Sequence, residues 1–103
     1  MKSSRTKATS ISSKVRKQVF ERDKHCIVCG RHDTLTVAHY ISRAKSGKGI
    51  PQNLVVLCMK CHMAVDNGNS KERADDIRLK MKTHLARHYT YWNERDLVYR
   101  KWG

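Results

Sequence analysis

The stretch that decides the fold is residues 26–62, which begins with CIVC at 26–29 and ends with CMKCH at 58–62. Each end carries two cysteines separated by two other residues, and 28 residues lie between the two pairs. Four thiolates at this spacing can surround one zinc ion tetrahedrally, which is the usual arrangement of a closed structural site. We therefore predict a structural Zn²⁺ ion held by Cys26, Cys29, Cys58 and Cys61.

The four cysteines could instead form two disulfides, in any of three pairings. The sequence shows no signal-peptide pattern and no apolar run of about 18 residues, so we expect a cytoplasmic protein with no membrane association. Thiols rarely pair in a reducing compartment. Zinc binding is therefore the favoured interpretation.

Size and charge both bear on the partner of this chain. It has 103 residues, of which 39% are hydrophobic, so the free energy of metal binding would help a small core to fold. Lysine and arginine number 22 against 9 acidic residues, which gives a net charge of +13. A domain this basic attracts polyanions, and nucleic acid is the expected partner. The alternative is that the charge serves solubility alone.

The chain divides into an arm and one domain. Residues 1–10 place basic residues among serine and threonine without apolar periodicity, which predicts a disordered basic arm. Residues 11–103 form the domain, with a motif core at 26–68 and a C-terminal helical extension at 69–103. Apolar spacing predicts one helix over about 12–22, and a capping box from Asn69 to Glu72 starts another that ends near His88.

Between the cysteine pairs, the pattern predicts a β-hairpin followed by a helix, and hence an α+β fold. Residues 34–41 alternate and are rich in β-branched side chains, and 54–57 form a second short apolar run. The glycines and lysines of 42–52 indicate a flexible cationic loop between the two strands. A helix starting near residue 59 would place His62 and Asp66 on one face, four residues apart.

This layout brings together residue types that suit hydrolysis of a phosphodiester bond. That reaction needs a base to activate water and a cation on the phosphate. The neutral imidazole of His39, at the end of the first strand, suits the first role. A second imidazole with a carboxylate suits metal binding, and an amide such as that of Asn53 can brace the loop.

Three segments, TVAHYI (36–41), GKGIPQNL (47–54) and LCMKCH (57–62), resemble the motif of HNH endonucleases. The resemblance is to the phage and prophage type with two Cys-x2-Cys pairs. It implies a ββα-metal, treble-clef-like core with a structural zinc and flanking N- and C-terminal helices. It makes His39 the general base and Asn53 the residue that fixes the hairpin loop. His62 becomes a ligand of a catalytic divalent cation, which would be Mg²⁺, Mn²⁺ or another transition ion.

One position departs from the family pattern. Many HNH proteins carry a metal-binding Asp or His directly before the base, where this chain has Ala38. The cation would then depend on His62 together with Asp66 or Asn53. The loop supplies three candidate contacts to nucleic acid: Arg43, Lys45 and Lys48.

The predicted function is a metal-dependent DNA endonuclease that nicks or cuts duplex DNA. By resemblance, its setting would be phage DNA processing such as packaging, with packaging proteins as further partners. The alternative is a non-catalytic, zinc-stabilised module that binds nucleic acid through its charge.

Overall fold

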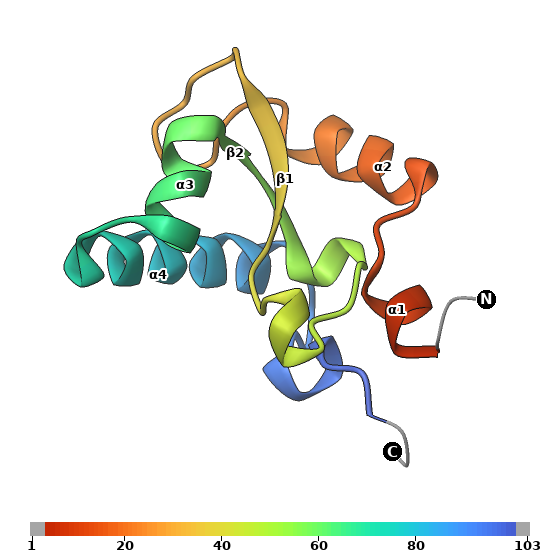
Figure 1. The fold of residues 1–103 in the computed structure, drawn as a ribbon. Coiled ribbons are helices and arrows are strands. Elements are labelled where there is room, and N and C mark those ends of the chain that lie inside the picture. Colours follow the sequence, from red (N-terminus) through yellow and green to blue (C-terminus); the bar gives the residue numbers. More distant parts are fainter. Residues whose placement is uncertain (1–3, 101–103) are drawn as a thin grey trace.

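A computed structural model describes residues 4–100 of the chain (Figure 1). Its regular elements, in chain order, are helices α1 (Ser4–Thr9) and α2 (Ser13–Asp23), strand β1 (Leu35–His39), 3₁₀ helices η1 (Arg43–Lys45) and η2 (Pro51–Asn53), strand β2 (Leu54–Cys58), helices α3 (Met59–Asn67) and α4 (Lys71–His88), and 3₁₀ helix η3 (Glu94–Leu97). Within this part of the chain, no helix has both the length and the apolar character needed to cross a membrane.

The centre of the fold is the antiparallel hairpin of β1 and β2, in which Leu35 pairs with Cys58 and His39 pairs with Leu54. Every residue of β2 is buried, because helices cover both faces of the hairpin: α2 on one side, α3 and α4 on the other (Figure 1). Side chains of a strand alternate between faces. Accordingly, Val56 packs towards α2 in one cluster, while Val55 packs with residues of α3 and α4 in another.

The predicted α+β fold, with a hairpin followed by a helix, is confirmed. The first strand is shorter than expected because the backbone N–H of Ile41 donates to the side chain of Asn53 instead of continuing the ladder. The cap of α4 is also one residue later than predicted: the Ser70 hydroxyl, and not Asn69, accepts from the backbone N–H of Arg73.

The N-terminal arm differs most from its prediction. Residues 4–9 form helix α1, whereas the composition predicted disorder over 1–10; residues 1–3 lie outside the described part of the chain. The helix is held by distant contacts, since Arg5 donates to the carbonyl of Arg43 at 2.6 Å and to the hydroxyl of Ser46 at 2.8 Å. Thr9 is buried at its end. Composition shows only local preferences, so it could not reveal these tertiary partners.

A buried carboxylate ties α2 to the hairpin and to α4. Asp23 accepts from both Arg22 and His84, with a 2.7 Å contact to His84 Nε2, and from the backbone N–H of Val56 in β2 at 2.9 Å. Burial alone would raise the pKa of Asp23, but these hydrogen bonds and the charge of Arg22 hold it well below its usual value. The ionised carboxylate is therefore part of the folded structure.

We expect Asp23→Asn to lower the free energy of unfolding by about 3 kcal/mol, because it leaves Arg22 and His84 without their anionic partner. Urea unfolding of the metal-loaded protein measures this change. The matched control is Asp33→Asn, which breaks the exposed ion pair of Asp33 with Arg31 and should change stability by about 0.5 kcal/mol or less. Equal losses in the two variants would contradict the assignment.

Candidate functional site

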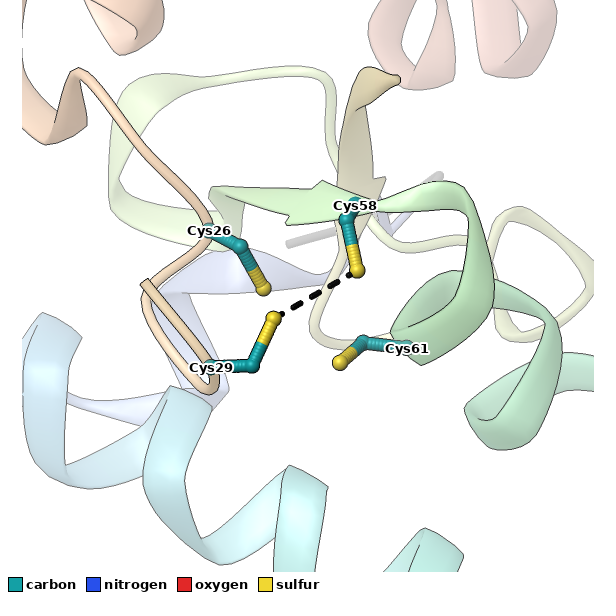
Figure 2. A group of neighbouring side chains, drawn as sticks. All are labelled: Cys26, Cys29, Cys58 and Cys61. Carbon is teal, nitrogen blue, oxygen red and sulfur yellow. Dashed lines mark hydrogen bonds between the residues drawn. The ribbon is translucent and has the colours of Figure 1, made fainter. Parts of the chain in front are cut away.

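The four cysteines come from two separate parts of the fold and point towards a common centre (Figure 2). Cys26 and Cys29 lie on the loop after α2, Cys58 ends β2, and Cys61 is in the first turn of α3. All are free thiols, and their sulfur atoms lie within 4.8 Å of one another. In a tetrahedral site with zinc–sulfur bonds near 2.3 Å the sulfurs are about 3.8 Å apart. The 3.6 Å between the sulfurs of Cys29 and Cys58 fits this geometry.

The local backbone shapes the first cysteine pair and favours the thiolate of Cys26. Gly30 takes a left-handed conformation with φ of 77°, and its N–H donates to the carbonyl of Cys26, which closes the tight turn. Burial opposes ionisation of Cys26, but hydrogen bonds from the backbone at Cys29, Cys58 and Val28 lower its pKa to about 6. The four sulfurs lie close enough together to hold one metal ion, as predicted, and their number and type fit zinc.

His39 ends β1 and is held by the N-terminal arm. Its Nε2 lies 3.0 Å from the backbone carbonyl of Thr9, which can only accept a hydrogen bond. The neutral ring therefore carries its proton on Nε2 and leaves the lone pair of Nδ1 available. Burial lowers the pKa of His39, as do the charges of Arg43 and His62, whereas the Thr9 contact and Asp66 act in the opposite direction.

Asn53 is fully buried and braces both ends of the loop between the strands. Its Oδ1 accepts from the backbone N–H of Ile41 at 2.8 Å. Its Nδ2 donates to the carbonyls of Ile41 at 3.0 Å and Lys48 at 2.9 Å. Because both polar groups of the amide are used in this way, Asn53 is not placed to bind a metal ion. Of the two residues considered as a second metal ligand beside His62, this leaves Asp66.

His62 and Asp66 lie on one face of α3, with His62 Nε2 3.0 Å from a carboxylate oxygen of Asp66. The other ring nitrogen, Nδ1, is 2.7 Å from the hydroxyl of Thr36 in β1. The Asp66 side chain is half exposed to solvent. An imidazole nitrogen and a carboxylate oxygen this close together are suitable donors for one divalent cation.

The His39 side of the site is a pocket of about 200 Å³. Asp66 forms part of its wall, as do Lys45 of η1 and Arg78 of α4. His62 is not on this wall and lines an adjoining hollow, which Asp66 also borders. The structure thus brings His39, Asp66 and Lys45 together and places His62 next to them.

The remaining predicted residues are spread around the loop. Arg43 is exposed, and its charge reaches His39. Lys48 does not line the pocket; it borders a separate hollow with Arg95. Sequence reasoning missed the contributions of Thr9, Thr36 and Arg78, because no motif or periodicity marks a residue that reaches the site from a distant element.

Residues 26–68 match the family model of the HNH endonucleases. The match covers the predicted motif core and spans less than half of the chain. The predicted resemblance is therefore confirmed, and none of the curated proteins compared with the chain matches it.

A solved structure extends the likeness of this chain beyond the motif. It is that of the Type IV phosphorothioation-dependent restriction endonuclease ScoMcrA, with a TM-score of 0.58 and 27% sequence identity over 76% of this chain. The chain covers 17% of the length of that protein. The likeness is therefore to one part of a much larger enzyme.

Protein purified without chelator should contain one zinc ion per chain, measured by plasma mass spectrometry with a thiol count. Cys26→Ser should abolish this zinc and most of the cooperative unfolding transition, because metal binding supplies folding free energy. His32→Ala is the matched control, since His32 is exposed beside the same loop and adds no sulfur. Zinc retained at full occupancy in Cys26→Ser would contradict the assignment.

Proposed function

We propose that this HNH protein is a metal-dependent endonuclease that hydrolyses phosphodiester bonds in duplex DNA. The observation that carries the proposal is the position of His39. It lies among the residues that match the family, and it lines a pocket together with a carboxylate and cationic side chains. The net charge of +13 supports a polyanionic substrate. Phage DNA processing in the cytoplasm, with packaging proteins as partners, is the setting we propose from the sequence resemblance alone.

In this proposal His39 is the general base. Its Nδ1 takes a proton from a water molecule as that water attacks phosphorus. The hydrogen bond from Nε2 to the Thr9 carbonyl fixes the ring so that the lone pair stays on Nδ1. Because burial lowers the pKa of His39, the ring is neutral and able to act as a base at neutral pH.

His62 and Asp66 would hold the catalytic cation, and the mixed nitrogen and oxygen donor pair suits Mn²⁺ or another transition ion better than Mg²⁺. A bound divalent ion supplies positive charge for the scissile phosphate and the departing 3′ oxygen. Asn53 keeps the loop in place, and Lys45, with Arg43 nearby, would contact backbone phosphates. The expected products carry 5′-phosphate and 3′-hydroxyl ends.

A second candidate function is a non-catalytic module that binds nucleic acid. The observation that favours it is Ala38, which is 2% exposed, packs in the core and offers no metal ligand. In that case DNA binding would fall steeply with salt and no divalent ion would elicit cleavage. A plasmid cleavage assay across a panel of divalent ions separates the two functions.

We expect His39→Ala to lower plasmid cleavage with Mn²⁺ by about 10²-fold or more, since a positioned base contributes about 10²–10⁴-fold. Zinc content and melting temperature should not change. The His32→Ala variant, which removes an exposed imidazole away from the pocket, should cut like wild type. Cleavage by His39→Ala at the wild-type rate would show that another group is the base.

The pH dependence gives a further check on the same residue. Only neutral His39 can accept a proton, so the cleavage rate should rise with pH and then level off. Because the pKa of His39 is lowered, the midpoint of this rise should lie below its usual value of about 6.5. A single-turnover pH–rate profile measures it, and a midpoint above about 7 would contradict the assignment.

A further inference from the structure

Thr36 makes two hydrogen bonds that together fix the protonation pattern of His62. It lies in β1 opposite Leu57, and its hydroxyl donates to the carbonyl of Leu57 at 2.8 Å. A threonine hydroxyl has one proton to donate. That proton is used on the Leu57 carbonyl, so the same oxygen can only accept from any other partner.

The other partner is His62, whose Nδ1 lies 2.7 Å from the Thr36 hydroxyl oxygen. Because that oxygen accepts, Nδ1 must carry the hydrogen. In the neutral ring the lone pair is then on Nε2, the atom that lies 3.0 Å from the Asp66 carboxylate. Two electron-rich atoms face each other there, which is a favourable arrangement only with a proton or a metal ion between them.

We propose that Thr36 is a positioning residue that holds His62 as the Nδ1–H tautomer, with Nε2 presented to the cation it shares with Asp66. The inference rests on the proposed function for the identity of that cation. Metal-binding histidines commonly donate their other ring N–H to a fixed acceptor, and loss of that acceptor weakens metal binding by about 10–100-fold. The acceptor here is anchored to the strand that carries Cys58, so the sulfur cluster also orients this ring.

The test is Mn²⁺ binding to the zinc-loaded protein without DNA, measured by electron paramagnetic resonance titration. Thr36→Val keeps the β-branched shape but removes the hydroxyl, and should bind Mn²⁺ about 10–100-fold more weakly. Thr36→Ser keeps the hydroxyl and should bind within about threefold of wild type. Thr83→Val, on the exposed face of α4, is the matched control and should not change affinity.

A second measurement reads the tautomer directly. Long-range ¹⁵N–¹H spectra of His62 should show Nδ1–H in wild type and Thr36→Ser, and a mixture in Thr36→Val. Wild-type Mn²⁺ affinity in Thr36→Val, or an Nε2–H tautomer in wild type, would overturn the role of Thr36. Absence of Mn²⁺ binding in wild type would instead overturn the cation site of the proposed function, while the spectra would still decide the tautomer.

Arg78 carries an independent inference, because its positive charge lies on the wall of the His39 pocket. It lies on α4, outside the residues that match the HNH family, and is exposed. Within residues 4–100 its guanidinium makes no hydrogen bond or ion pair. The other acidic residue of the pocket, Glu94, is already engaged: it accepts from the hydroxyl of Tyr40 at 2.8 Å and pairs with Lys82 at 3.4 Å.

We infer that Arg78 binds a phosphate oxygen of the DNA strand that enters this pocket. This inference rests on the proposed function. A planar guanidinium suits the two oxygens of a phosphate. It faces a pocket that also holds His39 and Asp66, so the phosphate it binds is the one cut or its neighbour. It would also supply positive charge at a site where Ala38 contributes no metal ligand.

The test compares Arg78→Gln with Arg87→Gln, which removes an equal charge from another exposed position on α4. Arg78→Gln should lower single-turnover cleavage by about 10²-fold, and Arg87→Gln by about threefold or less. Arg78→Lys should recover part of the rate because it retains the charge. Equal rates for the two glutamine variants would overturn the inference.

If the wild-type protein binds DNA but none of the divalent ions elicits cleavage, the proposed endonuclease function fails. The inference about Arg78 can still be tested in that case. Binding of a short duplex, followed by fluorescence anisotropy, then decides the role of Arg78. Weaker binding by Arg78→Gln than by Arg87→Gln supports the contact, and equal binding overturns it.

Discussion

The four cysteine sulfurs bring the loop after α2 next to the start of α3, and a metal ion bound there would join these two parts of the fold. A two-stranded hairpin alone is marginal in water, and this chain has a modest apolar core to support it. A metal ion held by the cluster would fix both ends of the segment that contains the hairpin, because Cys58 is the last residue of β2 and Cys61 lies in the next turn. The strands and α3 would then keep the relative positions on which the pocket depends.

Hydrogen bonds then hold the side chains of the site in position. Asn53 closes the loop, Thr36 joins the hairpin to His62, and the Thr9 carbonyl holds His39. Each contact joins elements that are separate in the chain. A further network around Asp23 holds α4, and with it Arg78, against the hairpin. The site is thus assembled from a small nuclease motif together with the segments on either side of it.

The sequence was most informative where the structure is determined locally or by a repeated spacing. The cysteine pairs predicted the cluster, and the alternation of β-branched residues predicted the hairpin, because both patterns follow from geometry over a few residues. The folding of α1 could not be predicted in this way, since it depends on Arg5 meeting a loop some forty positions away. The roles that we propose for Thr36 and Arg78 could not be predicted for the same reason: an isolated threonine or arginine has no pattern that distinguishes it from other surface residues.

The packing of the N-terminal arm against the loop has a practical consequence for protein production. The N–H of Gly49 donates to the carbonyl of Ala8, and a methyl group added at Gly49 would lie 2.1 Å from the carbonyl oxygen of Ser10. The two backbones are thus in direct contact beside His39. This contact leaves no room for a side chain at residue 49, so glycine should be kept there in any variant of the protein that is produced for study.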